Sequence, residues 1–402
     1  MMIRIAWKNI WRNRLRSLVI ILSTTIGVWS LIFLLSWVFG IIDGYISKAV
    51  DYRLSHIQVH HPKFQEDGEI KYYFQKGDLS EGLRDTIVGR TDRMVVSAMI
   101  QSPRSTRGLL LYGVDPIDER SVTRLDELIK EGTFLNAETR NPIVISTSIA
   151  EKLKVSLRSK VVANFQDRQG NITAGAFRIV GLFDSGDIKL DDFTAYIQKS
   201  DLAKLTGLPE EAAHEVAFRI IDLDAIPSVK EEIKEAWPDL VVEDYKELSP
   251  DIELFSSQIQ MNVIIMTIIF MLALIFGIIN SMLMAVLERV KELGMLMAIG
   301  MNKIRVFSMI VLETVMLSMI GVPLGLGIGY ITVYWMNQTG INLSNWSEGL
   351  RQFGMSQMVY PDLDPYYYGF VATAVAITSI LASIYPSLKA IRLKPVEALR
   401  KI

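Results

Sequence analysis

The run His-Ile-Gln-Val-His-His at residues 56–61 is the first stretch whose residue types could do chemistry, because imidazoles are common metal ligands. Apolar and polar residues alternate in this run, which predicts a β-strand. On a strand that rises about 3.3 Å per residue, His56 and His60 lie about 13 Å apart and cannot share one ion. The chain also contains no cysteine, which excludes thiolate ligands, disulfides and a cysteine nucleophile. We therefore expect no metal site.

Sequence motifs of catalysis are missing as well. The chain contains no G-x-x-x-x-G-K-[ST] phosphate loop, no G-x-S-x-G nucleophile elbow and no H-E-x-x-H helix. Aspartates and glutamates are plentiful between residues 43 and 255, but no spacing among them singles out an acid–base pair. We therefore expect a protein that is not an enzyme and that binds no cofactor of its own.

Glu313 is the one charged residue in the apolar segment 306–336. An ionised carboxylate near the bilayer centre costs about 3 kcal/mol on insertion scales, which the Leu, Ile, Val and Phe residues of the segment offset. Glu313 follows Arg305 by eight residues, or about 12 Å along a helix, so we expect it near the membrane interface. We interpret it as a structural partner of a neighbouring helix or of the adjacent loop backbone, with a proton relay as the alternative.

A charged connection at residues 288–305 lies between two long apolar segments. Its apolar residues recur at helical spacing, and its glycines remove side chains where another backbone could approach. A minimal turn between two membrane helices would not need a second apolar stripe. We therefore predict a short helix docked into a partner, with a turn and an early start of the next helix as the alternative. The stripe consists of Val290, Leu293 and Met297, and the glycines are Gly294 and Gly300.

Four apolar segments are long enough to position these residues in a membrane. A hydrocarbon core of roughly 30 Å needs about 20 apolar helical residues. The first segment is too long for the apolar region of a secretory signal. The predicted transmembrane helices span residues 17–42, 261–287, 306–336 and 365–388.

The distribution of basic residues predicts the orientation. Lysines and arginines flank the first segment on its N-terminal side, lie in the connection 288–305 and follow the last segment, whereas the loop 337–364 holds only Arg351. The positive-inside rule then places both termini in the cytoplasm. We expect an interfacial N-terminal helix (1–16), a large extracytoplasmic domain (43–255), a cytoplasmic connection (288–305), an extracytoplasmic loop (337–364) and a cytoplasmic tail (389–402).

The segment 43–255 mixes strand-like and helix-like runs. Its irregular order favours an α+β domain over a wound parallel sheet. The runs HIQVH, GLLLYGV, NPIVIS, KVVANF, AFRIVGLF and EVAFRII predict strands. Residues 117–131 and the runs TSIAEKLKV, KSDLAKLTG and IPSVKEEIKEAW predict helices. The segment holds 27 basic and 37 acidic residues, which argues against a nucleic-acid partner.

Three glycines of the third apolar segment, Gly321, Gly325 and Gly329, are four residues apart and share one helical face. Small residues at this spacing let a second helix approach closely. Pro323 lies within the same stretch and should kink or weaken the helix locally. We expect this face to pack against another transmembrane helix.

These features together resemble the FtsX/MacB class of ABC-transporter permeases, which combine one span, a large outer domain and three further spans. The connection resembles the R-x-R-E-I-G-x-L-R-A-I-G-A pattern of that class, although Lys291, Leu293 and Met297 depart from it. The matching positions are Arg289, Glu292, Gly294, Leu296, Ala298, Ile299, Gly300 and Glu313. In the tail the matching positions are Pro386, Ala390, Leu393, Pro395, Glu397, Ala398, Leu399 and Arg400.

Within this class, the outer segment is similar to lipoprotein-releasing permeases of the LolC/LolE type. The stretches that carry this similarity are SHIQVHHPKF, LYGVDPIDE, IVISTSIAEKLKV and FRIVGLFDSGDIKLDDFTAYI. The hook by which LolC-type proteins engage a periplasmic carrier is not recognisable in the sequence. The implied fold is an α-helical membrane protein with four transmembrane helices and a large α+β, MacB-like periplasmic core domain.

The resemblance implies a permease subunit in the inner membrane that extracts lipoproteins and passes them to a periplasmic carrier. Two separate ABC ATPase subunits would bind ATP and magnesium, and a second permease copy or paralogue would complete the assembly among the membrane lipids. The alternatives are a MacB-like efflux permease for peptides or drugs and an FtsX-like mechanotransducer that controls a cell-wall hydrolase.

The resemblance also implies roles for particular residues. The expected ATPase-coupling residues are Arg289, Lys291, Glu292, Gly294, Leu296, Ala298 and Gly300. The expected substrate cavity lies between the first and second spans, with Trp29, Phe33, Trp37, Ile265, Ile268 and Leu272 as its candidate lining.

Overall fold

The computed structural model describes residues 14–75, 77, 83, 86–136 and 139–392, and it divides the chain into two compact units. The helical unit contains the chain up to Ile42, residues 256–342 and the chain from Met358 onwards. The α+β unit contains residues 43–255 and 343–357. The expected N-terminal interfacial helix and most of the expected C-terminal tail lie outside the described residues.

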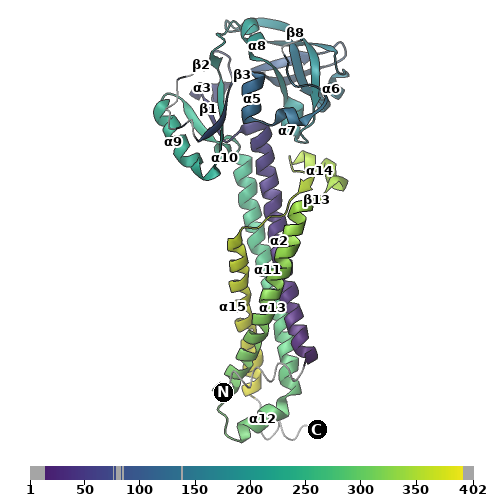
Figure 1. Ribbon diagram of the computed structural model, residues 1–402, viewed down its shortest axis with the longest axis vertical. Coiled ribbons are helices and arrows are strands. Elements are labelled where there is room, and N and C mark those ends of the chain that lie inside the picture. The colour runs from purple at the N-terminus through teal and green to yellow at the C-terminus, as the bar shows by residue number, and fades with distance from the viewer. Residues whose placement is uncertain (1–13, 76, 78–82, 84–85, 137–138, 393–402) are drawn as a thin grey trace. The chain divides into compact units, whose positions relative to one another are not determined.

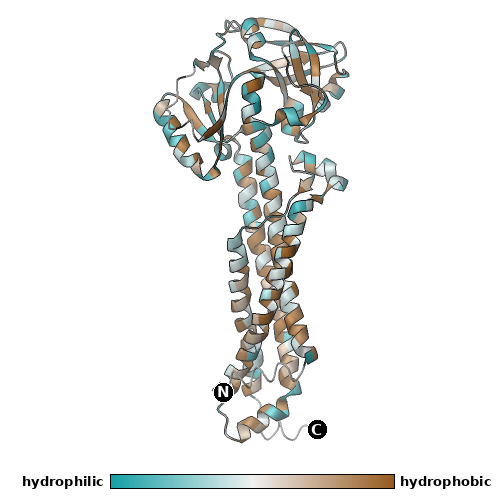
Figure 2. Ribbon diagram, in the orientation of Figure 1, coloured by the Kyte–Doolittle hydropathy of each residue, from teal (hydrophilic) through white to brown (hydrophobic). Residues whose placement is uncertain are grey.

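Four long helices form the helical unit, as the sequence predicts (Figure 1). Each is long and apolar enough to cross a membrane, and Figure 2 shows hydrophobic residues along most of their length. They are α2 (Arg14–Ala49), α11 (Pro250–Glu288), α13 (Lys303–Thr339) and α15 (Pro365–Ile391). The short helix α12 (Val290–Ala298) connects α11 to α13.

The glycine face of α13 packs against α2. A Cβ atom added to Gly325 would lie 2.7 Å from Cβ of Val28, a distance that leaves no room for a side chain. Gly321 faces Thr24 in the same way, at 2.8 Å. Such close approach maximises dispersion contacts between helices in lipid, where the hydrophobic effect adds little. The helix α13 continues through Pro323 without interruption.

The helix α11 differs from the other three in its exposure. Only 6% of its most apolar window is buried within the described residues, compared with 39% for the first span, 50% for α13 and 44% for α15. Ile265, Ile268 and Leu272 are about half exposed. A large apolar surface of α11 is therefore left for lipid or for another chain.

The α+β unit is built on a ten-stranded mixed sheet in the order β12-β1-β11-β3-β4-β9-β6-β8-β5, with β7 beside β3 and β8. Most neighbours are antiparallel, and the pairs β4–β9 and β6–β8 are parallel. The strands are β1 (Ile57–His60), β3 (Ile87–Gln101), β4 (Thr106–Val114), β5 (Ile129–Gly132), β6 (Pro142–Ser146), β7 (Lys160–Gln166), β8 (Ile172–Phe183), β9 (Thr194–Gln198), β11 (Glu215–Ile220) and β12 (Val241–Asp244). This mixed sheet confirms the predicted α+β class.

Short helices surround this sheet and bury its core residues, among them Ile100, Phe177 and Leu202. They are α3 (Pro62–Asp67), α5 (Pro116–Val122), α6 (Thr147–Leu153), α7 (Ile188–Phe193), α8 (Lys199–Thr206), α9 (Ile226–Ala236), α10 (Tyr245–Leu248) and α14 (Ser347–Gln352). The π-helix η1 (Val50–Leu54) follows α2, and the 3₁₀ turns are η2 (Leu125–Leu128), η3 (Leu223–Ala225) and η4 (Ser344–Trp346). Two small ladders pair β2 (Phe74–Gln75) with β10 (Ala212–Ala213), and β13 (Ile341–Asn342) with β14 (Met358–Val359).

The predicted helix over residues 117–131 is wrong in its second half. The helix α5 ends at Val122, and its C-cap Thr123 has an extended backbone. The chain then enters the turn η2 and the strand β5, which pairs with β8. Pairing with an existing sheet edge here overrides the helical preference of the local residues.

Buried charges connect the two halves of the sheet. Arg93 of β3 donates to both carboxylate oxygens of Glu119 in α5, at 2.9 and 2.7 Å, and to Glu215 of β11. All three side chains are buried. Such a group is well satisfied, so it fixes how α5 packs on the sheet.

The histidine run forms the predicted strand β1. His56 precedes it, and its Nδ1 atom accepts the backbone N–H of Ile220 at 2.9 Å. His60 ends the strand and is buried. His60 therefore lies in a strand paired on both sides, between β12 and β11, and His56 lies just before it.

The loop between α13 and α15 contributes residues 343–357 to the α+β unit, which differs from a separate loop spanning 337–364. Arg351 lies in α14 and donates to Asp184 at 2.6 Å and to Asp191 at 3.4 Å. Lys48 donates to the carbonyl oxygen of Met355 at 3.4 Å. These contacts hold the loop on α7, on the segment before it and on the C-terminal end of α2.

Candidate functional site

The helix α12 is the element that the charged connection predicts. It starts after Arg289, and its C-terminal turn is closed by Gly300, which adopts a φ of 102° that side chains disfavour. The N–H of Met301 donates to the carbonyl of Leu296 at 3.0 Å. Asn302 then caps α13 by accepting the N–H of Ile304. The chain therefore turns sharply into α13 without a long loop.

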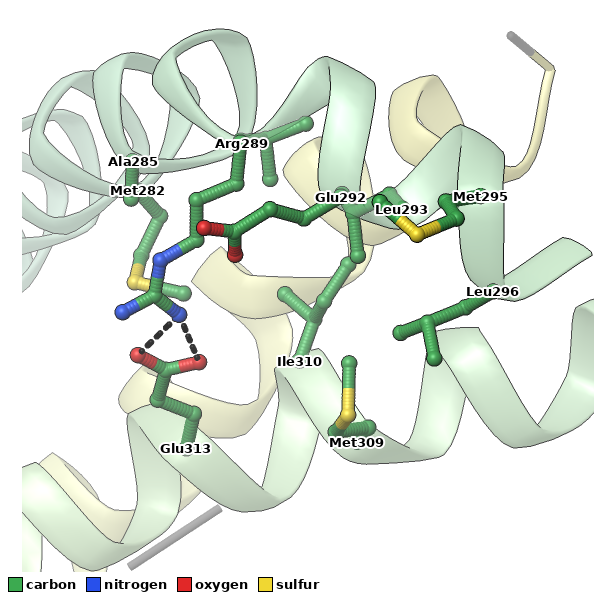
Figure 3. A pocket seen from close by; sticks show the side chains of 11 residues that line it. Met282, Ala285, Arg289, Glu292, Leu293, Met295, Leu296, Met309, Ile310 and Glu313 are labelled. Carbon is green, nitrogen blue, oxygen red and sulfur yellow. Dashed lines mark hydrogen bonds and ion pairs between the residues drawn. The ribbon is translucent and has the colours of Figure 1, made fainter. Parts of the chain in front are cut away.

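Arg289 and Glu313 form a buried ion pair at the base of α12 (Figure 3). Arg289 Nη1 lies 3.2 and 3.3 Å from the two carboxylate oxygens of Glu313. Arg289 is 9% exposed and Glu313 is 5% exposed. Glu313 is thus paired with a side chain at the junction of α11 and α12. The pair connects the start of α12 directly to α13.

A cavity of about 330 Å³ lies next to this ion pair (Figure 3). Its apolar side chains include Met282 and Ile310, and Figure 3 shows the carboxylate of Glu292 directed towards Arg289. Leu293 and Gly294 are the buried residues of α12. One face of α12 therefore packs on α11 and α13, with charged groups at its N-terminal end.

Another part of the α12 surface is exposed within the described residues. Met295, which also lines the cavity, is 51% exposed, and Ile299, just after the helix, is 79% exposed. Large apolar side chains exposed close together are typical of a protein contact surface. Neither residue is among the expected ATPase-coupling residues. The match of Ile299 to the family pattern is the signal that could have identified it.

The seven predicted coupling residues differ in how far they are buried. Arg289 and Gly294 are buried and lie on the packed face. Leu296 is partly buried. The remaining four residues are exposed, and they are Lys291, Glu292, Ala298 and Gly300.

The residues predicted to line a substrate cavity do not come together within the described part of the chain. Trp29, Phe33 and Trp37 follow one another along α2 with ring centroids 6.2 and 6.0 Å apart. Trp29 Nε1 donates to Oγ1 of Thr332 at 3.2 Å, so this end of the aromatic row contacts α13. The predicted residues of α11 are exposed instead, and they are Ile265, Ile268 and Leu272. Packing of the glycine face on α2 brings α13 next to Trp29 and explains the difference.

A different apolar cavity of about 410 Å³ lies between α2, α11 and α15. Of the six predicted residues only Ile268 lines it. Its lining also includes Leu35 and Phe39 of α2, Val263 of α11 and Tyr367 of α15. The rings of Phe39 and Tyr367 are 4.6 Å apart. The cavity therefore has a mostly apolar wall drawn from three membrane helices.

Two known protein families match this chain, one over its N-terminal part and one over its C-terminal part. The family described as the MacB-like periplasmic core domain matches residues 17–236, and the family described as the FtsX-like permease C-terminal region matches residues 264–395. The first match alone covers more than half of the chain. The chain therefore belongs to the ABC transporter permeases that carry a MacB-like periplasmic core domain and an FtsX-like permease region.

Individual relatives match different shares of the chain. A lipoprotein-releasing system transmembrane protein LolC of Neisseria meningitidis is 26% identical over 322 residues, which cover 75% of each chain. An uncharacterised ABC transporter permease of Methanocaldococcus jannaschii is 24% identical over 415 residues, covering 99% of this chain and 97% of the relative. A macrolide export ATP-binding/permease protein MacB of Rhodopirellula baltica is 31% identical over 125 residues, which cover 31% of this chain and 16% of the relative.

Proposed function

We propose that this permease extracts lipoproteins from the inner membrane and passes them to a periplasmic carrier. Similarity to LolC proteins over most of the chain supports this cargo class. Separate ATPase subunits bind ATP and magnesium in this proposal, since the sequence has no phosphate-binding loop. The termini and α12 face the cytoplasm, and the α+β unit lies in the periplasm.

The exposed face of α12 is the observation that carries the proposal. A helix with Met295 and Ile299 exposed beside Lys291 offers apolar contacts and a charge to a partner protein. In our proposal one ATPase subunit receives this face in a groove. Closure of two ATPase subunits around ATP then displaces α12 in each of two permeases.

The ion pair between Arg289 and Glu313 transmits this displacement. Because it joins the start of α12 to the interior of α13, a push on α12 moves α13 with it. The glycine face then carries the motion from α13 to α2, since the two backbones are in close contact.

The exposed side of α11 supports a second permease as partner. Its apolar side chains are largely unburied within the described residues. A second copy or a paralogue would cover part of this surface, and lipid the rest. The cavity between α2, α11 and α15 has the apolar wall that acyl chains require, and we assign the lipid part of the cargo to it.

Purification of the permease with its partners tests this proposal. Membranes are solubilised in mild detergent, the tagged chain is captured, and bound proteins are identified by mass spectrometry. The proposal expects an ATP-binding subunit and an acylated lipoprotein, with lipoprotein released on addition of ATP. Recovery of the ATPase with no lipoprotein, before or after ATP addition, would contradict the cargo assignment.

A MacB-like efflux role is the second candidate, because a MacB protein is 31% identical over part of the chain. In that case the same purification recovers a periplasmic adaptor protein instead of a lipoprotein. Resistance to peptides or macrolides would then depend on the permease.

A further inference from the structure

A second, polar cavity of about 250 Å³ lies in the α+β unit. Its wall is drawn from α2, η1, α7, α11 and the loop after α14. Side chains of both signs line it together with aromatic rings, and the six that matter here are Tyr45, Arg53, Asp187, Lys189, Asp251 and Phe255. Its size suits a headgroup or a small metabolite and not a folded partner.

Arg53 has an unused donor at this cavity. Its Nη2 atom donates to Oγ of Ser249 at 3.3 Å, but its Nε atom is buried and has no partner among the described residues. A buried guanidinium N–H without an acceptor is costly, and most such groups in folded proteins are satisfied. Arg53 lines the cavity, so an anionic group bound there would be stabilised by the positive charge of its guanidinium.

Asp187 supplies the opposite charge. Its Oδ1 atom accepts the backbone N–H of Lys189 and so caps α7, which leaves Oδ2 for another donor. Lys189 and Asp251 are paired with each other across the cavity wall. Arg53, Lys189, Asp187 and Asp251 together carry a formal charge of zero. A ligand with one positive and one negative group therefore fits better than a simple anion.

The aromatic wall favours a cationic group as well. The rings of Tyr45 and Phe255 are 4.7 Å apart, and both residues line the cavity. An ammonium group near aromatic faces is stabilised by the negative charge of the ring faces, most strongly when water is excluded. Tyr45 follows the uncharged stretch of α2 by three residues, and Phe255 lies at the start of the uncharged stretch of α11, two residues after Glu253. Tyrosines and basic residues at such positions are typical of the lipid headgroup level.

We propose that this cavity binds the zwitterionic phosphoethanolamine headgroup of a membrane phospholipid. The phosphate accepts from Arg53, and the ammonium group lies between Asp187 and the rings of Tyr45 and Phe255. The bound lipid is a resident component of the permease and is distinct from the lipoprotein cargo. The headgroup contacts α2, α7 and α11 together, so its loss weakens the packing of these three elements around the cavity.

Native mass spectrometry of the full chain tests this proposal. The protein is purified in detergent, mixed with micelles of equal phosphatidylethanolamine and phosphatidylglycerol, and the retained lipid is counted. Wild type retains one phosphatidylethanolamine in preference to phosphatidylglycerol. Arg53→Gln reduces retention of both lipids at least fivefold. Asp187→Asn keeps the helix cap, because Asn also caps helices, but removes the preference for phosphatidylethanolamine.

Arg104→Gln is the matched control, since Arg104 is an exposed arginine of the same unit, in the turn between β3 and β4. It should retain lipid like wild type.

Soluble glycerophosphoethanolamine is used in a second experiment. Its competition with the lipid at millimolar concentration supports the headgroup as the part of the lipid that the cavity recognises. Equal retention in wild type, Arg53→Gln and Asp187→Asn overturns the proposal. Retention of glycerophosphoethanolamine without any bound lipid overturns the membrane source. Neither outcome depends on lipoprotein release, which is measured separately.

Discussion

Single residues decide how firmly α12 is attached to the membrane helices. Arg289 and Glu313 form a buried ion pair in this region. Lys303 is exposed at the start of α13 and serves as the matched control.

Replacing Glu313 with Gln should weaken this attachment, because Arg289 stays buried but loses a charged acceptor. A hydrogen bond to a charged group contributes about 1.5–3 kcal/mol. We expect a lower melting temperature in detergent and a loss of most ATPase stimulation by the permease. Lys303→Gln should leave both unchanged. Full stimulation by the Glu313→Gln variant would mean that force does not pass through this pair.

His214 predicts a pH dependence of the α+β unit. Its Nδ1 atom accepts the N–H of Val95 at 3.1 Å, and its Nε2 atom lies 2.9 Å from the carbonyl oxygen of Ile70. This arrangement needs the neutral imidazole, and burial lowers the pKa of His214 to about 4 from 6.5. The unfolded chain takes up the proton first, so this contribution to stability is complete above pH 6.5 and is lost as the pH falls towards 4.

The check is the melting temperature of wild type, His214→Gln and His61→Gln between pH 7 and pH 4. His61 is only partly buried and is the control. We expect the decline between pH 6.5 and 4 to be clearly smaller in His214→Gln than in the other two proteins. Parallel curves for all three proteins would refute the assignment.

At the scale of elements, α2 and α13 pack closely through the glycine face of α13. A Cβ at Gly325 meets Val28 at 2.7 Å, whereas a Cβ at Gly327 meets no atom within 4 Å. Gly325→Leu should therefore force the helices apart and cost about 1–3 kcal/mol, as overpacked cores do. Gly327→Leu is the matched control and should be tolerated. We expect the melting temperature in the same detergent to be lower for Gly325→Leu than for Gly327→Leu. Equal melting temperatures would contradict the close packing of α13 on α2.

The loop after α13 is the second element with a testable attachment. Arg351 bonds to Asp184 and Asp191, and burial raises the pKa of the Asp191 carboxyl, so Arg351 helps to hold it charged at neutral pH. Arg351→Gln should increase hydrogen exchange in residues 347–352 by roughly fivefold, equivalent to about 1 kcal/mol. Glu348→Gln, an exposed change in the same turn, should have no effect. Unchanged exchange in Arg351→Gln would mean that other contacts hold the loop.

The sequence allows the elements to be predicted where one pattern dominates locally. Long uncharged runs predict the four membrane helices, and the glycines at spacing four predict the packed face of α13. The strand over 129–132 and the placement of residues 343–357 depend on contacts with distant segments, so no local pattern indicates them. The same holds for the site: α12 follows from its charges and glycines, but the partner of Glu313 requires the path of the chain between α11 and α13.

At the scale of the whole molecule, the chain belongs to a permease family and combines four helices long enough to cross a membrane with a large α+β unit. In the proposed function, mechanical work enters this chain from separate ATP-binding subunits. The helix α12, with an exposed apolar face and a buried attachment to α13, is where we place that entry.

Site-specific photo-crosslinking tests this placement most directly. A photo-reactive residue replaces Ile299 beside α12 in one protein and Trp335 near the far end of α13 in another, both of which are exposed. The two proteins are expressed in cells that contain the ATP-binding subunits and are irradiated. We predict a crosslink to an ATP-binding subunit from position 299 and none from position 335. A crosslink from position 335, or none from position 299 in a complex that still contains the ATPase, would contradict the account.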